Sequence, residues 1–171
     1  MNVWGLDLST SKIGCATGTG ELVSFSARAG AKDPYRRLSE LRREVVRNLR
    51  TYPPAPELVV VEDYALASPG RMSLVRLGEI GGVIRTELFE LGYRIALVTP
   101  TSLKRFATGN GAAKKPQMID AAIAAGARDT VNDDEADAFH LRRMGLAAHG
   151  LLPDRLLQHE LDAIANAGTT W

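Results

Sequence analysis

Residues 3–8 read VWGLDL, an apolar stretch with one acid, Asp7, in its interior. Two more β-prone stretches follow at residues 13–17 and 22–25, with the sequence Gly-Thr-Gly between them at positions 18–20. Glycine-containing turns between short runs of this kind are typical of β-hairpins. The first 28 residues therefore predict a three-stranded antiparallel meander that carries Asp7 on its first strand.

Helices and strands are expected to alternate after the meander. Asp33-Pro34 predicts a helix start, because Asp is a favoured cap and Pro a favoured first helical residue. Residues 58–62 read LVVVE, the continuous apolar pattern of a buried central strand that ends in Glu62. A further strand is expected at 93–98, with helices at about 73–91, from 100, from 116, at 132–149 and at 154–166. The class is α/β with a mixed central sheet flanked by helices.

Two expectations concern details of these helices. Gly78, Gly81 and Gly82 disfavour a helix, so their presence in the 73–91 segment indicates close approach of another helix. In the last helix, the apolar residues Leu157, Leu161 and Ile164 are expected to face inward, with Trp171 in a mobile tail.

Length and composition limit the classes of protein. A chain of 171 residues is expected to form one domain, here 1–171 with 151–171 as a C-terminal amphipathic helix and tail. One cysteine, Cys15, excludes an internal disulfide scaffold. No apolar run reaches the roughly 18 residues of a membrane helix, and an acid stands where a signal peptide would be apolar. We therefore expect no membrane association and a place in the cytoplasm.

The net charge of +1 is the sum of 21 basic and 20 acidic residues and hides how they are arranged. Asp7 lies inside a strand, Glu62 ends another, and Asp134 and Asp137 lie three residues apart at a helix start, hence on one face. Carboxylates without His or Cys partners favour a hard cation such as Mg²⁺. Several acids around one point would hold two cations, the arrangement used for phosphodiester hydrolysis.

Each acid also has a simpler explanation when it is taken alone. Asp7 could pair with a buried arginine, and Glu62-Asp63 could be a strand ending at the surface. Asp134 could complement the dipole of its helix. The combination of two strand acids with an Asp-x-x-Asp pair is what favours a metal site.

Four basic residues flank one glycine-containing loop, and they are candidates for DNA binding: Lys104, Arg105, Lys114 and Lys115. Phosphate binding requires such local positive charge, whatever the net charge of the chain. For Arg105 and Lys114, ordinary solvated loop charges are the alternative.

The order of these elements, over residues 1 to about 150, resembles the RuvC family of Holliday-junction resolvases, which have the RNase H-like fold. Asp7, in GLDLSTS, resembles the first-strand catalytic acid of that family, and Glu62 resembles the second. Asp134 and Asp137, in DEADA, resemble its closing acidic pair.

Residues 99–122 are the most specific segment of the resemblance: TPTSLK, a glycine loop, then KKPQM. Lys104 and Lys115 match two lysines that in the family lie near the scissile phosphate, which makes Lys115 a further catalytic candidate. The chain departs from the pattern at Ala65, where family members have an aromatic wedge. Tyr64, one position earlier, is a candidate substitute, and Asp63 adds negative charge near the expected phosphate path.

The resemblance implies an RNase H-like nuclease with Mg²⁺ as cofactor, two ions per active site, and Mn²⁺ able to substitute. It implies paired nicks in branched DNA that leave a 5′-phosphate and a 3′-hydroxyl, in a bacterial or phage-infected bacterial cell. Four-way junctions, flaps and forks are all candidate substrates. It also implies a homodimer formed through the 73–91 helix. The four acids Asp7, Glu62, Asp134 and Asp137 would be both the catalytic residues and the metal ligands.

Two other functions stay open from the sequence. The segment from Asp7 to Gly14 also resembles the first phosphate loop of actin-like nucleotide-binding kinases and ATPases, although those proteins have two lobes. A non-catalytic junction-binding module would retain the fold but would not need all four acids.

Overall fold

The computed structural model describes residues 1–10, 12–27, 33–64, 71–169 and 171. These residues form a mixed sheet with the strand order β3-β2-β1-β4-β5. The strands are β1 (Val3–Leu8), β2 (Lys12–Ala16), β3 (Leu22–Ser26), β4 (Leu58–Glu62) and β5 (Arg94–Val98). β1, β2 and β3 pair antiparallel, whereas β4 pairs parallel with β1 and β5. The predicted meander and the α/β class are confirmed.

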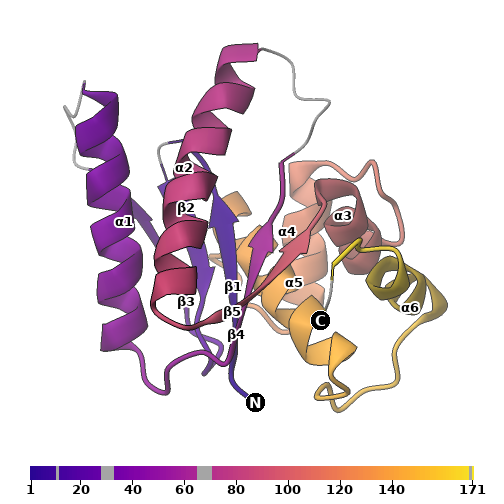
Figure 1. Ribbon diagram of the computed structural model, residues 1–171. Helices are drawn as coiled ribbons and strands as arrows, with labels where there is room; N and C mark the ends of the chain where they lie inside the picture. The colour runs from indigo at the N-terminus through magenta and orange to yellow at the C-terminus, as the bar shows by residue number, and fades with distance from the viewer. Residues whose placement is uncertain (11, 28–32, 65–70, 170) are drawn as a thin grey trace.

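Helices cover both faces of the sheet (Figure 1). They are α1 (Pro34–Thr51), α2 (Arg71–Glu90), α3 (Pro100–Thr108), α4 (Lys115–Ala124), α5 (Asp133–Ala148) and α6 (Gln158–Ala165). α1 and α2 lie on one side, and α3, α4 and α5 lie on the other. On the first side, Trp4 and Leu6 of β1 belong to a core with residues of α1 and α2. On the other side, Val3 belongs to a core with residues of α5.

α5 approaches the sheet closely because two strand residues have no side chain. A Cβ atom on Gly5 would lie 2.1 Å from the carbonyl oxygen of Ala138, and one on Gly14 would lie 2.0 Å from that of Asp134. Since Cβ contacts of this length do not occur, both glycines are required where α5 crosses β1 and β2. The first turn of α5 is therefore held directly over the strand that pairs with Asp7.

The helix starts predicted at Asp33-Pro34 and at residue 132 are confirmed. Asp33 caps α1 by accepting hydrogen bonds from the backbone N–H groups of Tyr35 and Arg36. At the start of α5, the side chain of Asn132 accepts a hydrogen bond from the N–H of Glu135, and the side chain of Glu135 accepts one from the N–H of Asn132, which forms a capping box. No helix in the described part of the chain is long and apolar enough to cross a membrane.

The C-terminal segment differs from expectation. α6 begins at Gln158 rather than near 154, because Glu160 accepts a hydrogen bond of 2.8 Å from the N–H of Leu157 and so caps the helix there. Leu157 and Leu161 are 60% and 45% exposed, so the expected inward stripe is wrong for these two residues. Ile164 packs against the core as expected, and the helix also buries Ala163. The predicted mobile tail is also wrong for Trp171, which packs against the core and donates to the carbonyl of Ile164.

Candidate active site

Asp7 and Glu62 lie side by side at the ends of neighbouring parallel strands. In the pairing of β1 with β4, Leu6 is opposite Val61, which places the next residues, Asp7 and Glu62, opposite each other. Side chains alternate along a strand, so Asp7 points to the same face as Gly5, towards α5. Asp7 is only 7% exposed. The strand register alone thus brings two of the predicted acids together.

The first turns of α5 bring the other acids to the same edge. Asp134 and Asp137 are one turn apart, and the electrostatic effect of each reaches Asp7. One carboxylate oxygen of Asp137 is buried and has no hydrogen-bond partner among the described residues. The positive end of the α5 dipole points at this cluster and favours negative charge there. The structure therefore brings all four predicted acids to one region.

Three of these acids, Asp7, Glu62 and Asp137, have raised pKa values. Burial, and then the charges of Glu62 and Asp137, raise the pKa of Asp7 well above its usual value, and its carboxyl group is hydrogen-bonded to that of Glu62. Burial also raises the pKa of Glu62, although the Asp7 hydrogen bond and the charge of Lys104 act against it. Burial and the charge of Glu62 raise the pKa of Asp137 to about 7. The positive charges near these three carboxylates therefore do not offset the effect of their burial.

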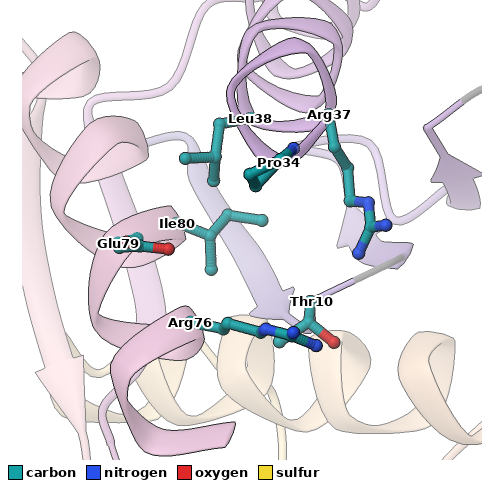
Figure 2. A pocket seen from close by; sticks show the side chains of 7 residues that line it. All are labelled: Thr10, Pro34, Arg37, Leu38, Arg76, Glu79 and Ile80. Atoms are coloured by element: carbon teal, nitrogen blue, oxygen red, sulfur yellow. The ribbon is translucent and has the colours of Figure 1, made fainter. Parts of the chain in front are cut away.

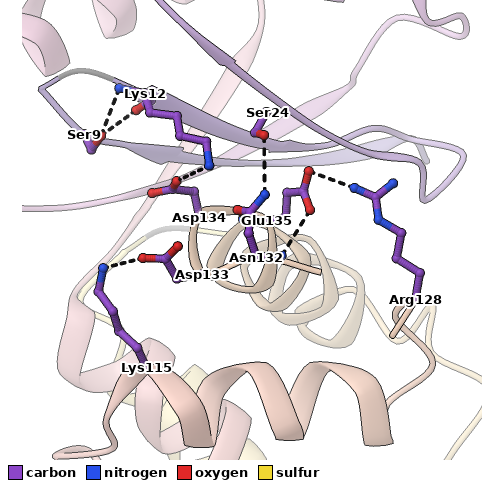
Figure 3. Close-up of polar contacts among 9 residues, drawn as sticks. All are labelled: Ser9, Lys12, Ser24, Lys115, Arg128, Asn132, Asp133, Asp134 and Glu135. Carbon is purple, nitrogen blue, oxygen red and sulfur yellow. Dashed lines mark hydrogen bonds and ion pairs between the residues drawn. The ribbon is translucent and has the colours of Figure 1, made fainter. Parts of the chain in front are cut away.

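Three lysines surround the acids. Lys104 of α3 is close enough to lower the pKa values of Glu62 and Asp137. Lys115, at the start of α4, forms an ion pair with Asp133 (Figure 3). The pKa of Lys115 is raised, first by this hydrogen bond and then by the charge of Asp133. Lys12 of β2 lies 2.9 Å from the carboxylate of Asp134 (Figure 3).

The chemistry of the donors fits a hard divalent cation. Buried carboxylates with raised pKa values and an unpartnered Asp137 oxygen are what a site for such an ion presents before the ion binds. The described residues do not, however, contain three or more His, Cys, Asp or Glu side chains already arranged around an ion position. Asp134 is engaged by Lys12, and its carboxylate would have to leave that lysine to bind an ion.

The remaining predicted DNA-binding residues are Arg105, Lys114 and Tyr64. Arg105 is exposed on α3, and Lys114 is exposed at the cap of α4, on the two sides of the glycine loop. No ion pair among the described residues involves either of them. Tyr64 is half-buried and points at α2, where its hydroxyl donates to the carbonyl of Gly78. Ala65, the position of the family's wedge, and the 68–70 loop lie outside the described residues.

Asp63 and Tyr64, which follow β4, both contact Arg85 of α2. The guanidinium of Arg85 donates to the carbonyl of Glu62 at 3.3 Å and pairs with Asp63 at 3.0 Å. It also stacks over the ring of Tyr64 at 4.3 Å. Gly81 makes room for that ring, since a Cβ atom there would overlap its hydroxyl. The charge of Asp63 is thus neutralised, and the end of β4 is fastened to α2.

Two residues of this region were missed from the sequence, Lys12 and Arg85. The signal for Lys12 was the alternation of β2, because Lys12 and Gly14 share the face that α5 covers. Arg85 had no local signal, since its partners are 22 and 23 positions earlier in the chain.

Comparisons with known proteins bear on this geometry. No family model matches the chain. The crossover junction endodeoxyribonuclease RuvC of Koribacter versatilis is 31% identical over 98 residues, which are 57% of this chain and 57% of that relative's length. The RuvC structure of Thermus thermophilus aligns with a TM-score of 0.59 at 22% identity and covers 88% of this chain and 98% of its own. The chain has the fold of the RuvC resolvases.

Two complexes with DNA share that fold. T. thermophilus RuvC with a Holliday junction substrate aligns with a TM-score of 0.62 at 22% identity, over 88% of this chain and 97% of that one. The Fowlpox virus resolvase with Holliday junction DNA aligns with a TM-score of 0.53 at 18% identity, over 85% and 99%. The predicted resemblance to the RuvC family and the RNase H-like fold class are confirmed.

Proposed function

We propose that this protein is a divalent-metal-dependent endonuclease that resolves Holliday junctions and related branched DNA by paired nicks, leaving a 5′-phosphate and a 3′-hydroxyl. The observation that carries the proposal is the convergence of Asp7, Glu62, Asp134 and Asp137 at one edge of the sheet, with lysines beside them. The RuvC fold supports it, because two resolvases with that fold are known in complexes with Holliday junction DNA. The site of action would be cytoplasmic.

The four acids would hold Mg²⁺, two ions when DNA is bound, with Mn²⁺ able to substitute. When bound, the ions supply an activated water and stabilise the leaving oxygen. The raised pKa values support this assignment, because a cation beside Asp7, Glu62 and Asp137 would favour their ionised forms.

The lysines would position the DNA backbone. Lys104 faces Glu62 and Asp137, and Lys115 stands at the rim of the cluster on the side chain of Asp133. A phosphate arriving at the acids would accept hydrogen bonds from both ammonium groups, so Lys115 would exchange Asp133 for DNA. Arg105 and Lys114 would contact the strand farther from the cut.

A homodimer would form through α2. Val75, Gly78, Gly82 and Phe89 are spaced 3, 4 and 7 residues apart and so share one face. Val75 is 53% exposed and Phe89 76% exposed, and a Cβ atom on Gly78 or Gly82 would meet nothing within 4 Å. This face is therefore apolar, narrow and uncovered in the single chain, as expected where two helices pack closely. Two sites in one dimer would cut two opposed strands.

The test uses purified protein and Mg²⁺ on labelled four-way, three-way, flap and linear duplex DNA. Symmetric paired nicks in the four-way junction, with 5′-phosphate ends and none in linear duplex, are the expected result. Equal cutting of flaps would extend the substrate class to branched DNA in general. ATP hydrolysis without DNA and no nicking would favour the actin-like alternative and contradict the proposal.

A further inference from the structure

A small cavity lies between α1, α2 and the turn that joins β1 to β2 (Figure 2). Its volume is about 130 Å³. The turn is closed by a hydrogen bond of 3.0 Å from the N–H of Ser9 to the carbonyl of Lys12. Lys12 pairs with Asp134 on the α5 side of the sheet, whereas Thr10 lines the cavity on the α1–α2 side. One short turn therefore separates this cavity from the candidate active site.

The lining of the cavity combines an apolar floor with two cations. Leu38 and Ile80 form the floor, and the guanidinium groups of Arg37 and Arg76 lie at the side of Thr10 (Figure 2). Among the described residues of the lining, Glu79 is the one acid. Within the described part of the chain, neither Arg76 nor Glu79 forms an ion pair.

The volume of the cavity and the hydrogen-bond donors that line it indicate which ligand it would hold. Ligand pockets for small molecules usually measure about 300–1,000 Å³, so this cavity is smaller than those that enclose a whole nucleotide. At about 30 Å³ per water molecule, the cavity has room for about four, which is enough for one phosphate group. Two guanidinium groups and a hydroxyl are donors suited to phosphate oxygens. The backbone donors at the start of α1 are occupied by Asp33, so side chains would hold the phosphate.

We propose that this cavity, lined by Arg37, Arg76 and Thr10, is a second phosphate subsite that holds the DNA backbone across the β1–β2 turn from the acids. The inference rests on the proposed function, because the phosphate in the cavity would belong to the DNA strand that the acids cut. A phosphodiester seated there would fix the direction in which the strand leaves the catalytic acids. The cavity would thus contribute to affinity and strand position and not to bond cleavage itself.

The test measures the affinity for a four-way junction as a function of salt concentration. Each phosphate contact contributes about 0.9 to the slope of log K against log salt, so Arg76→Gln should reduce the slope by about one. Arg37→Gln should weaken binding in the same manner. Arg94→Gln is the matched control, because Arg94 is equally an exposed arginine but begins β5 at the opposite end of the parallel strands. Its slope should equal that of the unmodified protein.

The outcomes separate the inference from the function on which it rests. If the unmodified protein does not bind or cut branched DNA, the proposed function fails. If it does, and Arg76→Gln has the same slope as Arg94→Gln, the subsite is wrong. Calorimetry with inorganic phosphate and with ATP provides a further arm. Micromolar binding of either one that is lost in Arg76→Gln, without a change in DNA affinity, would overturn the assignment to DNA backbone.

Discussion

At the scale of single residues, Asp137 links the acidic cluster to the stability of the protein. Its pKa is raised from 3.8 to about 7 in the folded chain, mainly by burial. A raised folded-state pKa stabilises the fold below pH 4, and this stabilisation is lost as the pH rises through about 7. Without metal, the free energy of unfolding should therefore fall between about pH 4 and pH 7 by up to a few kcal/mol, at about 1.4 kcal/mol per pKa unit.

Urea unfolding at several pH values, with a chelator present, measures this effect. Asp137→Asn should flatten the profile, because the amide does not titrate. Mg²⁺ at pH 8 should restore stability to the unmodified protein, since an ion that binds only the folded state stabilises it. A flat profile for the unmodified protein would contradict the electrostatic description of the cluster.

The acids themselves could be predicted from the sequence, but not the way they are paired. Asp7 interrupts an apolar strand and Glu62 ends one, and both patterns lie within a few residues of sequence. The ion pair between Lys12 and Asp134 joins residues far apart in the chain. It exists only because Gly14 allows α5 to lie against β2, and a contact of that kind depends on tertiary packing.

At the scale of elements, Arg85 couples α2 to the end of β4. It holds the carbonyl of Glu62 and the carboxylate of Asp63. Glu62 is a proposed metal ligand, and loss of a group that supports a metal ligand typically costs 10–100-fold in metal affinity or activity. Arg85→Gln should therefore slow cleavage by about 10-fold or more in single-turnover assays, and it should weaken DNA binding because Asp63 is left uncompensated.

A double variant distinguishes these two effects. Asp63→Asn in the Arg85→Gln background should recover DNA affinity but not the cleavage rate, because the Glu62 carbonyl still lacks its donor. The single Asp63→Asn variant is the matched control and should cut at nearly the original rate. Full recovery of cleavage in the double variant would show that only the charge of Asp63 matters.

Gly14 gives a second prediction at this scale. In Gly14→Ala, the new methyl group would collide with the backbone of Asp134. Since backbone cannot move aside as a flexible side chain does, α5 must shift, and overpacking of this kind costs about 1–3 kcal/mol or more. Thermal unfolding should show a melting temperature lower by several degrees, and an unchanged value would contradict the close approach of α5.

The elements were predictable where local chemistry decides them. Asp33-Pro34 and the Asn132–Glu135 box mark helix starts through contacts within one turn. The inner face of α6 was predicted only in part, because Leu157 and Leu161 are spaced as a buried stripe but are exposed, whereas Ala163 packs against the core beside Ile164. Small residues carry little hydrophobic signal, so a helix that packs through alanine is oriented by its neighbours rather than by its own pattern.

At the scale of the whole molecule, the proposed dimer depends on the apolar face of α2. Phe89→Asp places a charge on the most exposed apolar residue of that face. It should convert a dimer into monomers in sedimentation experiments, and it should produce single nicks instead of paired cuts in a four-way junction. Leu161→Asp is the matched control, because Leu161 is exposed on α6 and should leave the dimer intact. If the Phe89→Asp and Leu161→Asp variants are both monomers or both dimers, the proposal that α2 forms the dimer interface is contradicted.

The net charge of +1 does not argue against a DNA partner, because the sum does not show where the charges lie. Acids gather at the sheet edge and lysines surround them. A bound cation would turn the acidic patch from repelling phosphate to attracting it.

The central claim is that Asp7 and its neighbours hold the metal that cuts branched DNA. The most direct measurement is single-turnover cleavage of a labelled four-way junction with Mg²⁺ by Asp7→Asn, with junction binding measured in parallel. Loss of a metal ligand removes several kcal/mol of transition-state stabilisation, so the rate should fall by at least about 100-fold while binding persists. Asp120→Asn, an exposed acid on α4, should cut at the original rate. Unchanged cleavage by Asp7→Asn would contradict the account.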